Sequence, residues 1–230
     1  MKVSKETTEI LNNFSKINKN FLFTEGSTLQ TLNSSKSMLV EAKISELIPS
    51  RAGVVDLTKI LDCLKSFNDS ELFFNENSVK VANDYSEATF GLFPEEQIPH
   101  LKKAVSFDPS GVSFTLNWLT LSEIIRYSNL MGVKISQTSN SRTFDSVSFS
   151  GNGELMTVQV QESRTVQNET LKISLGESDR KFNFSLQAKE LVFIEDEYLC
   201  EVSKTKTIRF TGKNKPITYY LATLDCTVEE

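Results

Sequence analysis

The side chains that could carry out acid–base or nucleophilic chemistry are few in this chain. His100 is its only histidine and lies in a proline-containing stretch. Any catalytic site that pairs a nucleophile with a histidine base would therefore have to use this residue. The sequence contains no nucleophile elbow, no phosphate-binding glycine loop, no dinucleotide fingerprint and no HExxH helix. We therefore expect no catalytic residue and no enzymatic activity.

Carboxylates and thiols are the remaining candidates for chemistry, as metal ligands. Acidic residues cluster at 95–96 and 195–197 and could bind a metal ion, although solvated loop charge is the interpretation we favour. Cys63, Cys200 and Cys226 are far apart and form no CxxC pair, so neither a zinc site nor a disulfide framework is indicated. We expect no metal and no cofactor.

Cations recur on the outward faces of the predicted helices. The opening stretch SKETTEILNNFSKI, residues 4–17, has the pattern of an amphipathic helix capped by Ser4. Its apolar face carries Thr7, Ile10, Leu11, Phe14 and Ile17, and its opposite face carries Lys5, Asn12 and Lys16. Three further helices are predicted at 56–67, 119–131 and 186–194, with Asp56 as the cap of the first of these. Their outward faces carry Lys59, Lys65, Arg126, Lys189 and Glu190.

These cations stand out against the charge of the whole chain, which is formally -5 with a pI of about 5.2. A local basic face can attract phosphate while the rest of the surface repels it. The alternative is that these are ordinary surface lysines. No motif that reads base edges is present, so any DNA contact would be to the backbone, without sequence preference.

Strand patterns dominate the rest of the chain, which predicts an α+β protein. The order helix, strands, helix, strands occurs twice, which suggests two similar halves at 1–92 and 110–230. The connector 93–109 contains three of the five prolines. No apolar run is long enough to span a membrane and no signal segment is present, so we expect a cytoplasmic protein with no membrane partner.

Several stretches resemble the DNA polymerase sliding clamp of T-even-type bacteriophages. They are MKVSKETTEILNNFSKIN, EAKISELI, VVDLTKILDCL, ENSVKVAND, LSEIIRYSN and FNFSLQAKEL. The stretch KPITYYLATL, residues 215–224, is similar to the closing strand of proliferating-cell nuclear antigen. Taken alone, this stretch either completes a sheet or offers an apolar pocket to a partner peptide.

The resemblance implies the DNA clamp fold. In that fold two similar domains, each with two helices packed on curved antiparallel sheets, assemble head to tail into a trimeric ring. It further implies a processivity factor for the replicative DNA polymerase that encircles duplex DNA, is loaded by a clamp-loader ATPase, and works with late transcription factors in the cytoplasm of the infected host. A β-rich protein–protein adaptor without a DNA role remains the alternative.

The resemblance also implies roles for individual residues. The DNA-facing residues would be Lys5, Asn12, Lys16, Lys59, Lys65, Arg126 and Lys189. The partner-peptide pocket would be formed by Met38, Val40, Leu92, Phe93, Ile98, Leu101, Tyr219, Tyr220 and Leu221. For the subunit contact, the edge strand near 87–92 of one copy would meet the strand near 155–164 of the next.

Overall fold

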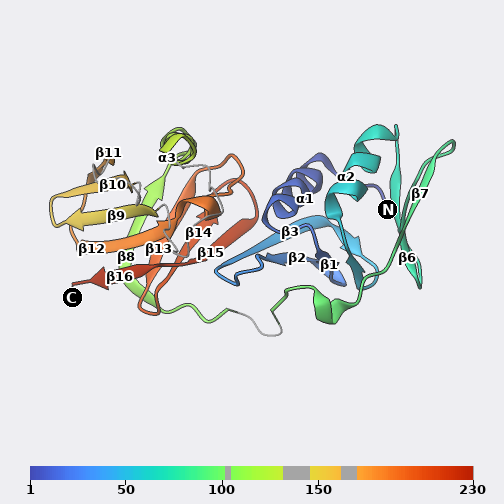
Figure 1. Cartoon of the computed structure of the whole chain (residues 1–230), viewed down its shortest axis with the longest axis horizontal. Helices are drawn as coiled ribbons and strands as arrows, with labels where there is room; N and C mark the ends of the chain where they lie inside the picture. The colour runs from blue at the N-terminus through green and yellow to red at the C-terminus, as the bar shows by residue number, and fades with distance from the viewer. Residues whose placement is uncertain (102–104, 132–145, 162–169, 230) are drawn as a thin grey trace, which may run out of the picture. The chain divides into compact units, whose positions relative to one another are not determined.

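The computed structural model describes residues 1–101, 105–131, 146–161 and 170–229, which belong to two compact units (Figure 1). The first unit comprises Met1–Val105 with the short segments Val192–Ile194 and Lys215–Tyr219. The second comprises Ser106–Leu191, Glu195–Asn214 and Tyr220–Glu230. The stretch VKISQTS, residues 133–139, has a strand pattern but lies outside the described residues. No helix in the described part is long and apolar enough to cross a membrane.

The two helices of the first unit form where the sequence predicts them. Helix α1 (Lys5–Ile17) begins after Ser4, whose side chain accepts a hydrogen bond from the backbone N–H of Thr7. Helix α2 (Leu57–Ser66) begins after Asp56, which accepts from the N–H of Thr58. Each helix buries one apolar face, as the periodicity requires.

The strands of the first unit pair as antiparallel neighbours. They are β1 (Phe21–Phe23) with β4 (Ala52–Val54), β2 (Gly26–Leu32) with β3 (Met38–Ile48), and the three-stranded sheet of β5 (Glu71–Phe74), β6 (Ser78–Ala82) and β7 (Glu87–Gly91). The short 3-10 turn η1 (Glu95–Gln97) follows. Phe14, Phe21 and Phe23 form a chain of ring contacts, with centroids 5.8 and 4.9 Å apart, which ties α1 to β1.

The second unit contains one α-helix, α3 (Trp118–Met131), within its described residues. One sheet has the order β11 (Thr170–Glu177), β10 (Leu155–Gln161), β9 (Ser146–Asn152), β12 (Lys181–Gln187) and β16 (Asp225–Val228). The strand β13 (Tyr198–Ser203) pairs with both β8 (Pro109–Leu116) and β14 (Thr207–Gly212). The strand β15 (Ile217–Ala222) contributes its first three residues to the first unit and its last three to the second.

Stacked phenylalanines fill the core of the second unit. The ring of Phe114 lies 6.1 Å from those of Phe149 and Phe182 and 6.4 Å from that of Phe184, all with small interplanar angles. Strands β9 and β10 form a hairpin, and Gly153 allows its turn because φ there is +91°.

The fourth predicted helix is reduced to a single 3-10 turn, η2 (Ala188–Glu190). Strand β12 continues through Gln187, which leaves too few residues for an α-helix to repay the cost of its first turn. The expectation that Glu190 points outward is wrong, since this side chain is 3% exposed.

Candidate nucleic-acid interface

The outward face of α1 is basic, as the sequence indicates. Lys5, Asn12 and Lys16 are exposed, whereas Ile10 and Phe14 on the opposite side are fully buried. Within the described ranges, neither lysine forms an ion pair. The nearby carboxylate of Glu9 is bound by the Lys215 ammonium. This ion pair reduces the negative charge beside the two lysines.

Helix α2 packs beside α1 and adds two more exposed cations, Lys59 and Lys65 (Figure 1). A hollow of about 500 Å³ lies where the helices meet, and its lining includes Lys2, Asn12 and Lys65. Lys2 was not among the predicted residues, because it precedes the helix pattern. Its ammonium lies 3.1 Å from the exposed Asp69 carboxylate, a pair that contributes little to stability.

In the second unit, the outward cations come from α3 and η2, which are also neighbours. Arg126 is exposed, and its guanidinium lies 4.8 Å from the centre of the Tyr127 ring and donates to the Tyr127 hydroxyl at 3.1 Å. Lys189 is exposed on η2. The opposite face of α3 is buried through Leu121 and Ile124.

A carboxylate from β3 fixes the start of α1. Glu46 accepts hydrogen bonds of 2.5 Å from the Ser4 N–H and from the Thr7 hydroxyl. Burial alone would raise the pKa of Glu46, but the hydrogen bonds from Thr7, Ser4 and Ser45 outweigh it and lower the pKa to about 2. The carboxylate therefore remains ionised at the helix N-terminus, where the helix dipole favours negative charge.

A buried polar residue, Asn13, fixes the other side of the same helix. Its side-chain N–H donates to the carbonyl of Val192 at 3.1 Å, and its oxygen accepts from the hydroxyl of Tyr219 at 3.1 Å. That hydroxyl also accepts from the N–H of Ile194. No local sequence pattern indicates this network, because the partners of Asn13 lie 179 and 206 positions away.

The residues predicted for a partner pocket differ in exposure. Met38, Val40, Ile98, Tyr219 and Leu221 are buried in the isolated chain. Leu92 and Leu101 are each 37% exposed, and Phe93 is half-buried. In the second unit, Tyr220 is half-buried, and its ring lies 6.3 Å from that of Phe107.

One of the two strands predicted to form the subunit contact is not a sheet edge. Among the described residues, strand β7 pairs with β6 alone and is an edge, as predicted. The expectation for 155–164 is wrong, because β10 pairs with β9 on one side and β11 on the other. Within the described residues, the edges of this sheet are β11 and β16.

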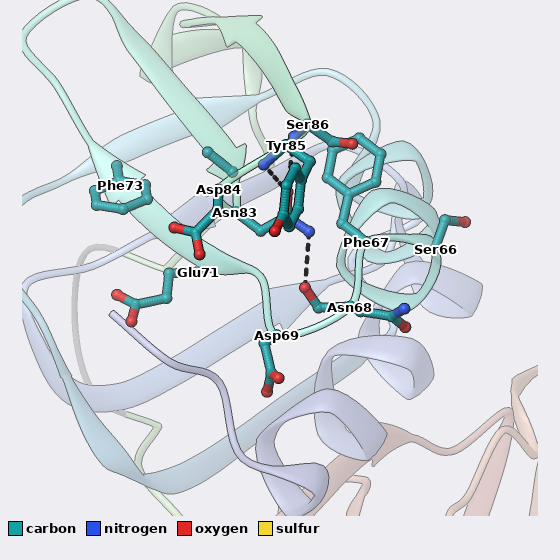
Figure 2. A pocket seen from close by; sticks show the side chains of 11 residues that line it. Ser66, Phe67, Asn68, Asp69, Glu71, Phe73, Asn83, Asp84, Tyr85 and Ser86 are labelled. Atoms are coloured by element: carbon teal, nitrogen blue, oxygen red, sulfur yellow. Dashed lines mark hydrogen bonds between the residues drawn. The ribbon is translucent and has the colours of Figure 1, made fainter.

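A second hollow, of about 600 Å³, lies at the end of α2 beside the sheet that contains β7 (Figure 2). Asn83 shapes its rim, since its side chain donates to the Asn68 carbonyl at 2.8 Å and accepts from the N–H groups of Tyr85 and Ser86. Tyr85 itself is 94% exposed. The turn between β6 and β7 thus presents an aromatic side chain to solvent.

The acidic cluster at 195–197 has a structural role. Asp196 is 5% exposed and accepts hydrogen bonds from the backbone and side-chain N–H groups of Asn214, so the expectation of solvated charge is wrong there. Across the described ranges, no group of three or more histidine, cysteine or acidic residues is placed to hold a metal ion.

The sequence is similar to phage sliding clamps. It is 24% identical, over 229 residues, to the sliding clamp of Vibrio phage KVP40, a match that covers 97% of this chain and 99% of that protein. It is 27% identical over 130 residues to the sliding clamp of Escherichia phage RB69, covering 56% of this chain and 57% of that protein. No protein-family model matches the chain.

The fold is that of cellular clamps. The PCNA2–PCNA3 complex of Sulfolobus tokodaii matches with a TM-score of 0.63 at 14% identity, covering 94% of this chain and 95% of that one. The A. fulgidus PCNA bound to the C-terminal region of FEN-1 matches at 0.60 and 13%, covering 97% and 95%. The DNA polymerase III beta subunit of Thermotoga maritima matches at 0.70 and 14%, covering 98% of this chain and 64% of that one. The chain is thus similar to the KVP40 sliding clamp along nearly its whole length and shares the α+β fold of the solved clamps.

Proposed function

We propose that three copies of this chain close head to tail around duplex DNA and tether the replicative polymerase during synthesis. The observation that carries the proposal is the basic outward face of α1 and α2, two packed helices of an otherwise acidic chain. Lys5, Lys16, Lys59 and Lys65 are exposed there, and none of them forms an ion pair with a described residue. Such a face suits phosphate contact without reading bases.

Net charge and local charge then have complementary effects. A ring of three copies carries three times -5, or -15, so DNA is repelled from most of its surface. The helix cations attract the backbone weakly and in a salt-dependent way. Weak contact permits sliding, and the closed ring, more than affinity, keeps the protein on DNA. The protein therefore needs no catalytic residue.

Ring closure uses two of the sheet edges in the described part of the chain. We place β7 of one copy against β11 of the next, because unpaired edge strands require a partner or protection. Half-buried Phe90 on β7 and Ile173 on β11 gain burial on pairing, and exposed Glu87 and Lys172 carry opposite charges. Tyr85, in the turn next to β7, supplies further contact area.

The polymerase docks through a short apolar peptide. The exposed members of the predicted pocket are Leu92 and Leu101. Leu92 directly precedes residues 93–100 of the connector, and Leu101 directly follows them. The A. fulgidus PCNA carries a bound segment of FEN-1, which supports docking of this kind. A clamp-loader ATPase opens the ring, and late transcription factors dock on the same clamp in the cytoplasm of the infected host.

Solution mass tests the ring first. Light scattering across a concentration series should give three times the chain mass of 25.9 kDa, falling towards one copy on dilution. A charge reversal on β11, Lys172→Glu, should shift this transition to higher concentration, because it places two acidic residues at the contact. A strict monomer at high concentration would instead support the adaptor interpretation.

Retention on DNA tests the encircling role. After loading, the protein should stay on circular DNA at a salt concentration that removes it from linear DNA of the same sequence. Equal loss from both forms would contradict a topological link.

A further inference from the structure

Connector residues 93–101 are held by three kinds of contact to β4 and to Arg51, the residue just before it. The N–H of Phe93 donates to the carbonyl of Gly53 at 2.9 Å. Ile98, which is 4% exposed, packs over the same glycine. A Cβ atom at Gly53 would lie 2.3 Å from the Phe93 carbonyl oxygen and 2.8 Å from Ile98 Cδ1, so this close approach requires glycine.

The third contact is an ion-pair cluster centred on Glu95 in η1. Two nitrogens of the Arg51 guanidinium donate to the Glu95 carboxylate. Nε donates to Oε2 at 3.1 Å, and Nη2 donates to Oε1. The Nε2 atom of His100 lies 3.4 Å from the same Oε1 atom. The Nδ1 atom of His100 lies 2.8 Å from the carbonyl oxygen of Ile98.

In the sequence, this cluster lies between two exposed leucines, one just before the connector and one within it. Leu92 directly precedes the bond to Gly53, and Leu101 directly follows His100. An apolar partner can only use both side chains together if the backbone between them keeps one conformation. A two-bond arginine–carboxylate contact fixes orientation as well as distance, which a lysine would not do.

We propose that Arg51 is a positioning residue for the partner-docking surface, and that it acts through Glu95 to hold residues 93–101 on β4. This inference rests on the proposed function for the identity of the partner, an apolar polymerase peptide. The contact itself lies wholly within the first unit and can be tested in the free protein.

Amide hydrogen exchange measures directly how firmly Arg51 and Glu95 hold residues 93–101, a contact called the clasp below. Arg51→Glu should speed exchange of the Phe93, Gln97 and Ile98 amides about fivefold, the ratio for roughly 1 kcal/mol. The swap Arg51→Glu with Glu95→Arg should restore protection. Lys213→Glu is the matched control, because the Lys213–Glu197 pair has similar side-chain exposure, 45% and 40% against 50% and 38% for Arg51 and Glu95. Unchanged exchange in Arg51→Glu would overturn the clasp.

Primer extension with the replicative polymerase from the same genome tests the positioning role. Arg51→Glu should shorten the products while mass and retention on circular DNA stay as in the parent, and the charge swap should restore their length. Loosened amides with full-length products would overturn the positioning role. A parent protein that is monomeric and not retained on circular DNA would instead refute the proposed function. The hydrogen-exchange result would still show whether Arg51 and Glu95 hold residues 93–101.

Discussion

Reversing the charge of Lys16 should weaken DNA binding by an amount that follows from its position. Lys16 is exposed on the outward face of α1 and pairs with no described carboxylate, so its charge is available to phosphate. At about 8 Å in water a unit charge pair is worth roughly 0.5 kcal/mol, and reversal doubles the change to about 1 kcal/mol per site. Three copies then reduce affinity by between about fivefold and about a hundredfold, depending on how many face phosphate together.

The control for this experiment is Lys43→Glu. Lys43 is exposed on β3 between buried Ala42 and Ile44, on a sheet and not on a helix. Both variants change the formal net charge of the chain equally, from -5 to -7. Fluorescence anisotropy of a short labelled duplex over a series of salt concentrations gives the affinity and its salt slope. Lys16→Glu should reduce the slope by about 1 to 3, since each lost phosphate contact removes about 0.9. Equal weakening by the two variants would show that net charge alone matters and would refute the assignment of α1 to the DNA side.

Three further changes test how the helices and strands are held. Glu46→Gln should lower the free energy of unfolding in urea by about 1 kcal/mol at neutral pH. Because folding lowers the pKa of Glu46 from 4.5 to about 2, the difference from the parent should shrink as the pH falls from about 5 towards 2, and a constant difference would contradict the role of the charge. Tyr219→Phe removes two buried hydrogen bonds and should cost about 2 kcal/mol in urea unfolding, and a double-mutant cycle with Asn13→Ala should show strong coupling. Gly151→Ala would place a Cβ atom 2.6 Å from the Arg180 carbonyl oxygen, so the melting temperature should fall by several degrees, and an unchanged melt would contradict this close approach.

The helices were predictable where a local pattern decided them. Ser4 and Asp56 cap α1 and α2, and the 3.6-residue spacing of apolar residues defines their buried faces. The outcome at the fourth predicted helix was not predictable in this way. The residues of 186–194 favour a helix by composition, but the first two of them belong to strand β12. Tertiary pairing overrides helix propensity in such short segments.

The candidate site divides in the same way. The outward lysines of α1 and α2 follow from helix geometry, since the side opposite a buried stripe must be exposed. Contacts between distant positions carry no such local signal. Asp196 looks like surface charge until Asn214 is placed beside it, and β10 looks like an edge until β11 covers it. These are the positions where the sequence-based interpretation was wrong.

The single tryptophan, Trp118, is the first residue of α3 and belongs to the second unit. Its ultraviolet emission is therefore an optical label that the first unit lacks. Circular dichroism responds to both units, so the two signals together can separate the melting of one from that of the other. Arg126 stands two turns further along the same helix, and duplex entering the ring should change the colour or intensity of this emission without any attached dye.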